Sequence, residues 1–267
     1  MGATADLHLT GITVLLCDAD GNLFPSEEPA FVASTEVTNR FLRDYGVDKT
    51  FTPEELRLAT TGKNFRSTML DLALAHGIPR ESDHVHADRG GGAGLVLDEI
   101  ARARWVAEEQ RAVTGYLRTH LAPDPQVSEP LKALSERFSL ALVSSSATAR
   151  LAACLEVTDL GALFPAGRRF SAEDSLPVPT SKPDPAIYTL AMSALGITTD
   201  QGLAIEDSIP GAQAAVAAQL RTIGNVAFVP EDERAERIAA LQLAGVVGIV
   251  SSWSELATLL LGDGQPE

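Results

Sequence analysis

The sequence predicts an α/β protein with a doubly wound parallel sheet. The first observation is a set of short apolar runs, each followed by small polar or acidic residues, at 12–17, 138–143, 202–205 and 246–250. Runs of this kind suit strands that are buried on both faces. The second observation is a helical pattern after the last three runs, which makes repeated strand–turn–helix units. In such a Rossmann-like sheet, ligands bind beyond the carboxyl ends of the strands, so we expect the polar residues there to converge.

The predicted helices begin just after serines. The three patterns start after Ser146, Ser208 and Ser252. A serine side chain accepts a hydrogen bond from a free N–H group at a helix start, so we interpret Ser146 and Ser208 as N-caps. Pro210 suits the first turn of its helix.

A long helical insertion is expected after the first strand. Ser144 follows Asp18 by 126 positions, whereas a parallel crossover needs only about a dozen residues. Helical patterns within this stretch cover 29–45, 53–60, 65–76 and about 95–121. We therefore predict a Rossmann-like core formed by residues 1–26 and 127–267, and a helical cap domain formed by residues 27–126.

Charge and composition exclude several classes of protein. The 267-residue chain carries 36 acidic and 21 basic residues, a formal net charge of −15, whereas non-specific nucleic-acid binding needs a basic surface. No run approaches the roughly 18 apolar residues of a membrane span, and the N-terminal segment lacks the basic leader of a signal peptide. The two cysteines make no disulfide framework. We expect a cytoplasmic monomer or homodimer that binds neither nucleic acid nor membrane.

Two acidic pairs stand at strand ends. Asp18 and Asp20 follow the first strand and precede Gly21, whereas Glu206 and Asp207 follow the strand at 202–205. On neighbouring strands, such pairs would form an oxygen-rich site for a hard cation, and Mg²⁺ suits a site with few carboxylates. Taken singly, the first pair is also compatible with an Asx-turn and the second with a helix entry.

A serine run and a lysine offer contacts for an anion. Ser144, Ser145 and Ser146 combine hydroxyl and N–H groups at a strand-to-helix turn, which is a natural phosphate cradle. The alternative is one capping serine followed by loop residues. Lys182 is one of only four lysines and precedes two prolines, so it could place an ammonium group among the carboxylates. The alternative is a solvated loop lysine.

Together, these elements resemble the four signature motifs of the haloacid dehalogenase superfamily. The similar residues, in motif order, are Asp18-Ala19-Asp20-Gly21, Ser144, Lys182 before Pro183-Asp184-Pro185, and Glu206-Asp207-Ser208 with Gly211. The resemblance covers about residues 12–26 and 128–255. The place and helical pattern of the insertion resemble the helical cap of the beta-phosphoglucomutase and phosphoglycolate phosphatase branch.

The resemblance implies a role for each motif. Asp18 would be the nucleophile that forms an aspartyl-phosphate. Asp20 would be the general acid for the leaving oxygen and then the base for water. Ser144 would bind the phosphoryl group with help from Ser145, and Lys182 would orient and shield Asp18.

The resemblance also implies Mg²⁺ as the cofactor. Asp18, Asp207 and the backbone carbonyl of Asp20 would hold the ion, and Glu206 would assist directly or through a water molecule. Catalysis would then consist of positioning and charge neutralisation, as phosphoryl transfer requires.

Two positions depart from the resembled pattern. Asn22 stands where the family often has Thr or Val, and Pro25-Ser26-Glu27 stands where many relatives have Asp before Ser-Glu. We interpret both as changes to the loop that follows the first motif. The second acid, Asp20, argues against dehalogenation, because the true dehalogenases of the family lack it.

Within the insertion, segment 61–66 lies where relatives of this type carry a substrate-specificity loop. Lys63, Asn64 and Arg66 are candidate contacts for a phosphate or for hydroxyl groups. The alternative is a helix start with ordinary surface bases. Trp105 is predicted to lie in the core of the cap rather than to form a platform for substrate.

The predicted function is a Mg²⁺-dependent phosphatase, a phosphoric monoester hydrolase that acts on a small phosphorylated substrate such as a sugar phosphate or a phosphoglycolate-like acid. The first alternative is a beta-phosphoglucomutase-like phosphomutase, which needs an acid/base group in the cap. A phosphonate hydrolase would need Lys63 as a Schiff base. The last alternative is a non-catalytic binding module that has kept the fold.

Overall fold

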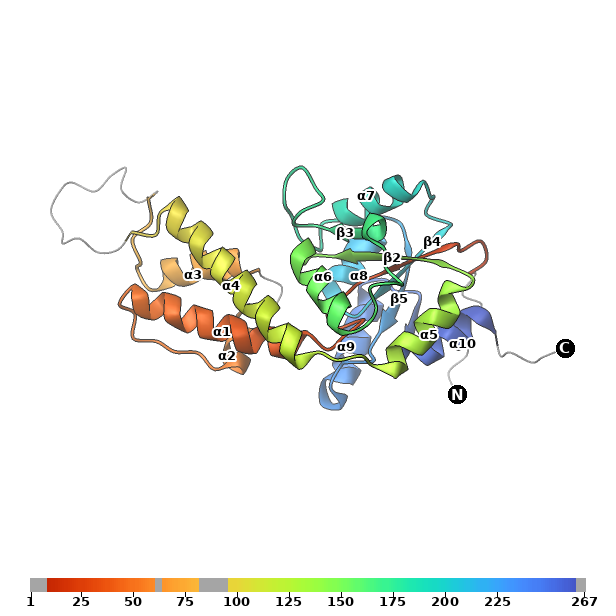
Figure 1. Cartoon of the computed structure of the whole chain (residues 1–267), viewed down its shortest axis with the longest axis horizontal. Helices are drawn as coiled ribbons and strands as arrows, with labels where there is room; N and C mark the ends of the chain where they lie inside the picture. The colour runs from red at the N-terminus through yellow and green to blue at the C-terminus, as the bar shows by residue number, and fades with distance from the viewer. Residues whose placement is uncertain (1–8, 61–63, 82–95, 263–267) are drawn as a thin grey trace. The chain divides into compact units, whose positions relative to one another are not determined.

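The chain forms two compact units. A computed structural model describes residues 9–60, 64–81 and 96–262 (Figure 1). The first unit combines Met1–Ser26 with Leu121–Glu267, and the second is Glu27–His120. The second unit is therefore an insertion into the first.

The first unit is built on a parallel sheet. In the described part of the chain, the sheet has six strands in the order β3-β2-β1-β4-β5-β6. Their bounds are β1 Val14–Cys17, β2 Ser139–Ser144, β3 Arg169–Ser171, β4 Gly202–Glu206, β5 Arg221–Asn225 and β6 Gly248–Val250. Because β2 and β3 lie on one side of β1 and the later strands on the other, the winding reverses between β1 and β4. Such a reversal is the preferred place for a ligand site in an open parallel sheet.

Helices connect these strands. In the first unit they are α5 Pro125–Ser135, α6 Thr148–Val157, α7 Ala186–Leu195, α8 Ile209–Ala217, α9 Glu231–Leu243 and α10 Trp253–Leu261, with a short 3₁₀ helix at Ala166–Arg168. Val14 and Leu16 of β1 pack in one cluster with Ala191 of α7 and Ala214 of α8. Every residue of β1 and β4 is buried, which is why these strands read as unbroken apolar runs. The predicted doubly wound α/β fold is confirmed.

Two strands lack the pattern that predicts the others. β5 begins with Arg221 and ends with Asn225, and it also contains Gly224, so it has no continuous apolar run. β3 spans only three residues, too few for a periodic signal. Both strands form because neighbouring strands supply parallel partners for their backbones.

The second unit is helical where it is described. Its helices are α1 Glu27–Asp44, α2 Pro53–Thr60, α3 Phe65–Ala75 and α4 Glu99–His120. Phe41 of α1 and Trp105 of α4 meet edge to face, with ring centroids 5.7 Å apart. Trp105 is 2% exposed, which confirms its predicted place in the core of this unit.

The return to the first unit comes at Leu121 rather than at the expected residue 127. The physical reason is the start of α5, because Asp124 caps this helix and Pro125 occupies its first turn. Val127 and Leu131 are then buried, and α5 packs against α10 of the first unit.

Among the described residues, no helix is both long enough and apolar enough to cross a lipid bilayer.

Candidate active site

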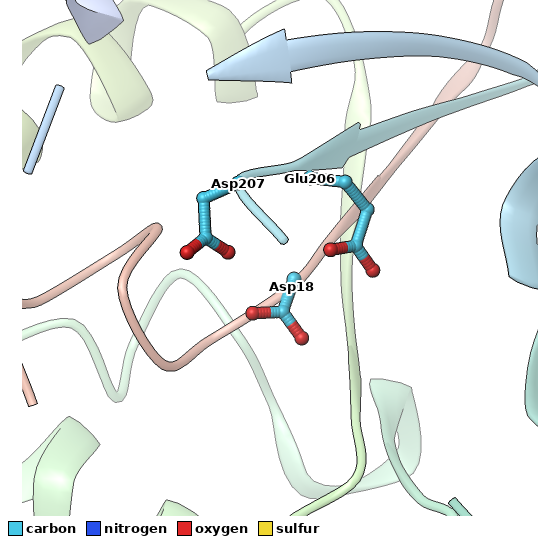
Figure 2. Close-up of side chains that lie close together, drawn as sticks. All are labelled: Asp18, Glu206 and Asp207. Carbon is cyan, nitrogen blue, oxygen red and sulfur yellow. The ribbon is translucent and has the colours of Figure 1, made fainter. Parts of the chain in front are cut away.

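Three carboxylates converge at the carboxyl ends of β1 and β4. Cys17 pairs with Ile205 in the parallel ladder, and the N–H of Asp18 donates to the Ile205 carbonyl at 3.0 Å. This register brings Asp18 beside the end of β4, which carries Glu206 and Asp207. Figure 2 shows the three side chains close together, and one oxygen from each carboxyl group lies within 4.8 Å of the others.

Lys182 enters this cluster from the loop before α7. Its Nζ donates to Asp18 Oδ1 at 2.5 Å, to Glu206 Oε1 at 2.6 Å and to the Val143 carbonyl at 2.8 Å. The lysine side chain is 5% exposed, so the alternative of a solvated loop lysine is wrong. The ammonium group therefore fixes the positions of two carboxylates that would otherwise repel each other.

The electrostatics follow from burial and from the excess of negative charge. Burial raises the pKa of Asp18 to about 8; the Lys182 ammonium opposes this shift and the Glu206 carboxylate adds to it. Burial alone would lower the pKa of Lys182, but the two carboxylates outweigh it and hold that pKa above its ordinary value. Lys182 therefore stays protonated. Asp18 would become more acidic if a cation joined the site.

Glu206 is fully buried and held from several directions. Its Oε1 accepts from Lys182 and also from the hydroxyl of Tyr188 at 2.6 Å. Gly211, in the first turn of α8, lies against the same carboxyl group, and a Cβ there would overlap it. Ser208 caps α8 by accepting from the Gly211 N–H at 3.1 Å, which confirms its predicted role.

Asp207 completes the cluster. It is 2% exposed, and its backbone carbonyl accepts from Arg237 Nη1 at 3.0 Å. The position of Asp207 directly after β4 places its carboxyl group opposite Asp18 across the boundary between the two strands (Figure 2).

Asp20 points to a different set of partners. Its Oδ1 accepts from Ser26 Oγ at 2.5 Å and from Arg150 Nη2 at 2.8 Å, and its Oδ2 accepts from Ser146 Oγ at 2.6 Å. Burial alone would raise the pKa of Asp20, but Arg150 and the two hydroxyl donors outweigh it and hold that pKa below its ordinary value. The Asp20 side chain is thus an ionised group with a fixed direction, separate from the three clustered carboxylates.

The serine turn lines the same end of the sheet. Ser144 is buried and its Oγ accepts from the Ser146 N–H at 3.0 Å. Ser145 Oγ accepts from the backbone N–H of Lys182 at 3.1 Å, so this serine anchors the lysine loop. The turn thus connects both Asp20 and Lys182 to the end of β2.

The predicted N-cap role of Ser146 is wrong. The N-cap residue of α6 is Ala147, whose side chain makes no capping hydrogen bond. The backbone N–H of Thr148, at the start of the helix, donates instead to Asp174 Oδ2 at 2.6 Å. The Ser146 hydroxyl is engaged by Asp20, a partner 126 positions away in the chain. Spacing along the sequence gives no sign of that contact.

Sequence reasoning missed three contributors to this site. Arg150 and Ser26 bind Asp20, and Tyr188 binds Glu206. Arg150 carried a usable signal, because it lies four residues after Ser146 and is a basic residue in the first turn of a largely apolar helix. The sequence holds no comparable signal for the hydroxyls of Ser26 and Tyr188.

The candidate residues of the inserted unit are only partly described. Lys63 lies outside the described residues. Asn64 is the N-cap of α3 and accepts from the Ser67 N–H at 2.9 Å, and Arg66 is exposed in the first turn of the same helix. The capping role of Asn64 agrees with the alternative of a helix start, and a contact of either residue with substrate stays a prediction.

Comparisons with known proteins cover both units. The sequence model of the haloacid dehalogenase-like hydrolases matches residues 12–219. Protein CbbY of Cereibacter sphaeroides is 28% identical over 261 residues, which cover 93% of this chain and 95% of that protein. A solved mutant of CbbY from Rhodobacter sphaeroides, in complex with xylulose-(1,5)bisphosphate, is 23% identical, with 92% and 96% of the two chains covered and a TM-score of 0.64. A HAD family hydrolase from Deinococcus radiodurans R1 with bound phosphate and sodium is 23% identical, with 94% and 95% covered and a TM-score of 0.61.

Proposed function

The chain belongs to the haloacid dehalogenase-like hydrolases, and from this premise we propose that it is a Mg²⁺-dependent phosphatase of small phosphorylated metabolites. The family assignment bears out the resemblance seen in the four motifs. The observation that carries the proposal is the convergence of Lys182 with the carboxylates of Asp18, Glu206 and Asp207 at the switch between β1 and β4. The phosphate and sugar bisphosphate held by similar structures support a phosphorylated substrate.

The cluster fits a divalent cation in charge and in ligand type. Asp18, Glu206 and Asp207 supply carboxylate oxygens, the donors that hard cations prefer. With all three ionised and Lys182 protonated, one divalent cation would neutralise the site. We propose that Asp18, Asp207 and the Asp20 backbone carbonyl hold Mg²⁺, with Glu206 beside it. The ion would supply charge neutralisation for the phosphoryl oxygens.

The chain's own residues perform the transfer in this proposal. Asp18 attacks the phosphorus atom, its carboxylate oxygen forms the new bond, and the bond to the leaving oxygen breaks. Asp20 must first leave Arg150 and take up a proton, because a carboxylate held by a cation is a poor acid. It then gives this proton to the leaving oxygen. Later it takes a proton from the water that attacks the aspartyl-phosphate, and the bond between phosphorus and Asp18 breaks. Ser144 and Ser145 would bind the phosphoryl oxygens, and Lys182 directs Asp18.

Further parts of the proposal concern the substrate contacts, the cellular location and the oligomeric state. Lys63, Asn64 and Arg66 are proposed to contact the substrate from the inserted unit. Cys17 and Cys154 are both buried, and neither forms a disulfide in the described part of the chain, which supports a reducing, cytoplasmic location. As a monomer or a homodimer, the enzyme would act on sugar phosphates or short phospho-acids.

A phosphate-release screen tests the proposal. Purified protein is incubated with sugar phosphates, nucleotides and short phospho-acids, with Mg²⁺ or with a chelator, beside the variants Asp18→Asn and Asp200→Asn. We expect release that needs Mg²⁺, disappears in Asp18→Asn and persists in Asp200→Asn, because Asp200 is an exposed residue before β4. Full activity of Asp18→Asn would overturn the mechanism. Conversion of hexose 1-phosphate to hexose 6-phosphate without release would instead identify a phosphomutase.

A further inference from the structure

Asn22 is a fully buried polar residue beneath the candidate active site. It lies in the turn that follows Asp18-Ala19-Asp20-Gly21, within the loop that the sequence indicated, but its side chain is buried. A buried amide group must find hydrogen-bond partners, because an unpaired one costs stability. The hydrogen-bond partners of the Asn22 side chain therefore indicate its role.

The Asn22 amide nitrogen bridges the ends of two strands. Its Nδ2 donates to the Asp18 carbonyl at 2.9 Å and to the Ile205 carbonyl at 3.1 Å. The first carbonyl belongs to the residue after β1, and the second lies near the end of β4. The Ile205 carbonyl also accepts the Asp18 N–H. Asn22 therefore adds a cross-link between β1 and β4 where their ladder ends and the carboxylate cluster begins.

A chain of amides fixes the direction of this cross-link. The backbone N–H of Ala227 donates to Asn225 Oδ1 at 3.1 Å, so the Asn225 nitrogen must face Asn22. That nitrogen donates to Asn22 Oδ1 at 2.8 Å. The Asn22 nitrogen then faces the two strand carbonyls, which only accept. The orientation of both side chains thus follows from one backbone donor just after the end of β5.

A second contact holds the backbone of Asn22. The indole Nε1 of Trp253, at the start of α10, donates to the Asn22 carbonyl at 2.9 Å. The residue is thereby connected to β1, β4, β5 and α10. A threonine here has a single hydroxyl group, which cannot donate to two carbonyls while it accepts from Asn225.

We propose that Asn22 is a positioning residue that holds the ends of β1 and β4 at the spacing Asp18 and Asp207 need to share a divalent cation. The inference rests on the proposed function, since it concerns the same cation site. Mg²⁺ demands short, nearly octahedral coordination, so a change in the spacing of the two strand ends lowers its affinity. Asn225 sets the orientation of the Asn22 amide and therefore contributes to the same positioning role.

The test is calorimetric titration of the metal-free protein with Mg²⁺ alone. We expect Asn22→Ala and Asn225→Ala to raise the dissociation constant about 10- to 100-fold, the usual effect of losing a group that orients a metal ligand. Thr222→Val is the matched control. Thr222 is also buried in β5, and its hydroxyl donates to the Leu220 carbonyl, away from the strand ends, so this variant should bind like the native protein. Far-UV circular dichroism and urea unfolding verify that each variant is folded.

The outcomes separate this inference from the proposed function. If the native protein does not bind Mg²⁺, or if Asp207→Asn binds it equally well, the cation site itself fails. If Asp207→Asn abolishes binding while the folded asparagine variants stay within about threefold of the native constant, the positioning role is overturned. It is also overturned if Thr222→Val weakens binding as much as they do. Should Asn22→Ala not fold, Asn225→Ala, which keeps the Asn22 side chain, decides the question.

Discussion

A methyl group added at Gly211 should disturb the site without changing any charged or polar residue. A Cβ at this position would overlap the carboxyl group of Glu206. That group is the shared acceptor of Lys182 and Tyr188, and it is fully buried. In Gly211→Ala, either α8 must move away or Glu206 must leave its partners.

The magnitude follows from the contacts that are lost. Breaking a buried ion pair costs about 3–5 kcal/mol, whereas Ala in place of Gly in a helix gains about 0.5–1 kcal/mol. We therefore expect Gly211→Ala to lower the free energy of unfolding by about 2–4 kcal/mol. Displacement of Glu206 also moves Lys182 relative to Asp18, and a shift of about 1 Å at a reacting group costs about 100-fold in rate.

Urea unfolding and phosphate release measure the two effects. Gly115→Ala is the matched control, because Gly115 lies in α4 and a Cβ there would meet nothing within 4 Å. This variant should be about 0.5–1 kcal/mol more stable than the native protein. The reasoning is refuted if both variants are stabilised and Gly211→Ala keeps its full activity.

Two further substitutions test the charges of the site. Lys182→Met should reduce turnover about 100-fold or more. It should not weaken Mg²⁺ binding in calorimetry, because the substitution removes a positive charge beside Asp18 and Glu206. Retained turnover would contradict the role of the lysine. Arg150→Met tests the pairing of Arg150 with Asp20, which lowers the pKa of Asp20 below its ordinary value of 3.8. The pair therefore stabilises the folded protein fully above pH 3.8, and this stabilisation is lost as the pH falls through the lowered pKa. The variant should lose about 1–3 kcal/mol near pH 7 and much less near pH 3 in urea unfolding, and an equal loss at both pH values would argue against the pair.

The sequence was most informative where burial on both faces leaves a simple pattern. β1 and β4 read as apolar runs, and the acids that follow them occupy neighbouring strand ends, as the parallel geometry requires. β5 could not be read in this way, because Arg221, Gly224 and Asn225 interrupt its pattern.

Side-chain contacts that the geometry of the sheet does not dictate could not be predicted. Ser146 looked like a helix cap, yet its hydroxyl binds Asp20. Asn22 lies in the expected loop, yet its buried side chain bridges the ends of two strands. In both cases, a partner more than a hundred positions away decides the role of the side chain, and local spacing carries no record of that partner.

The most direct test of the account is to look for a phosphoryl group on Asp18 during turnover. The protein is mixed with Mg²⁺ and a substrate from the screen, quenched in acid, and analysed by peptide mass spectrometry. We expect one added phosphoryl group on the peptide that contains Asp18, lost on treatment with hydroxylamine and missing in Asp18→Asn. Turnover at the native rate with no phosphorylated peptide, or with the group on a different residue, would contradict the proposed nucleophile.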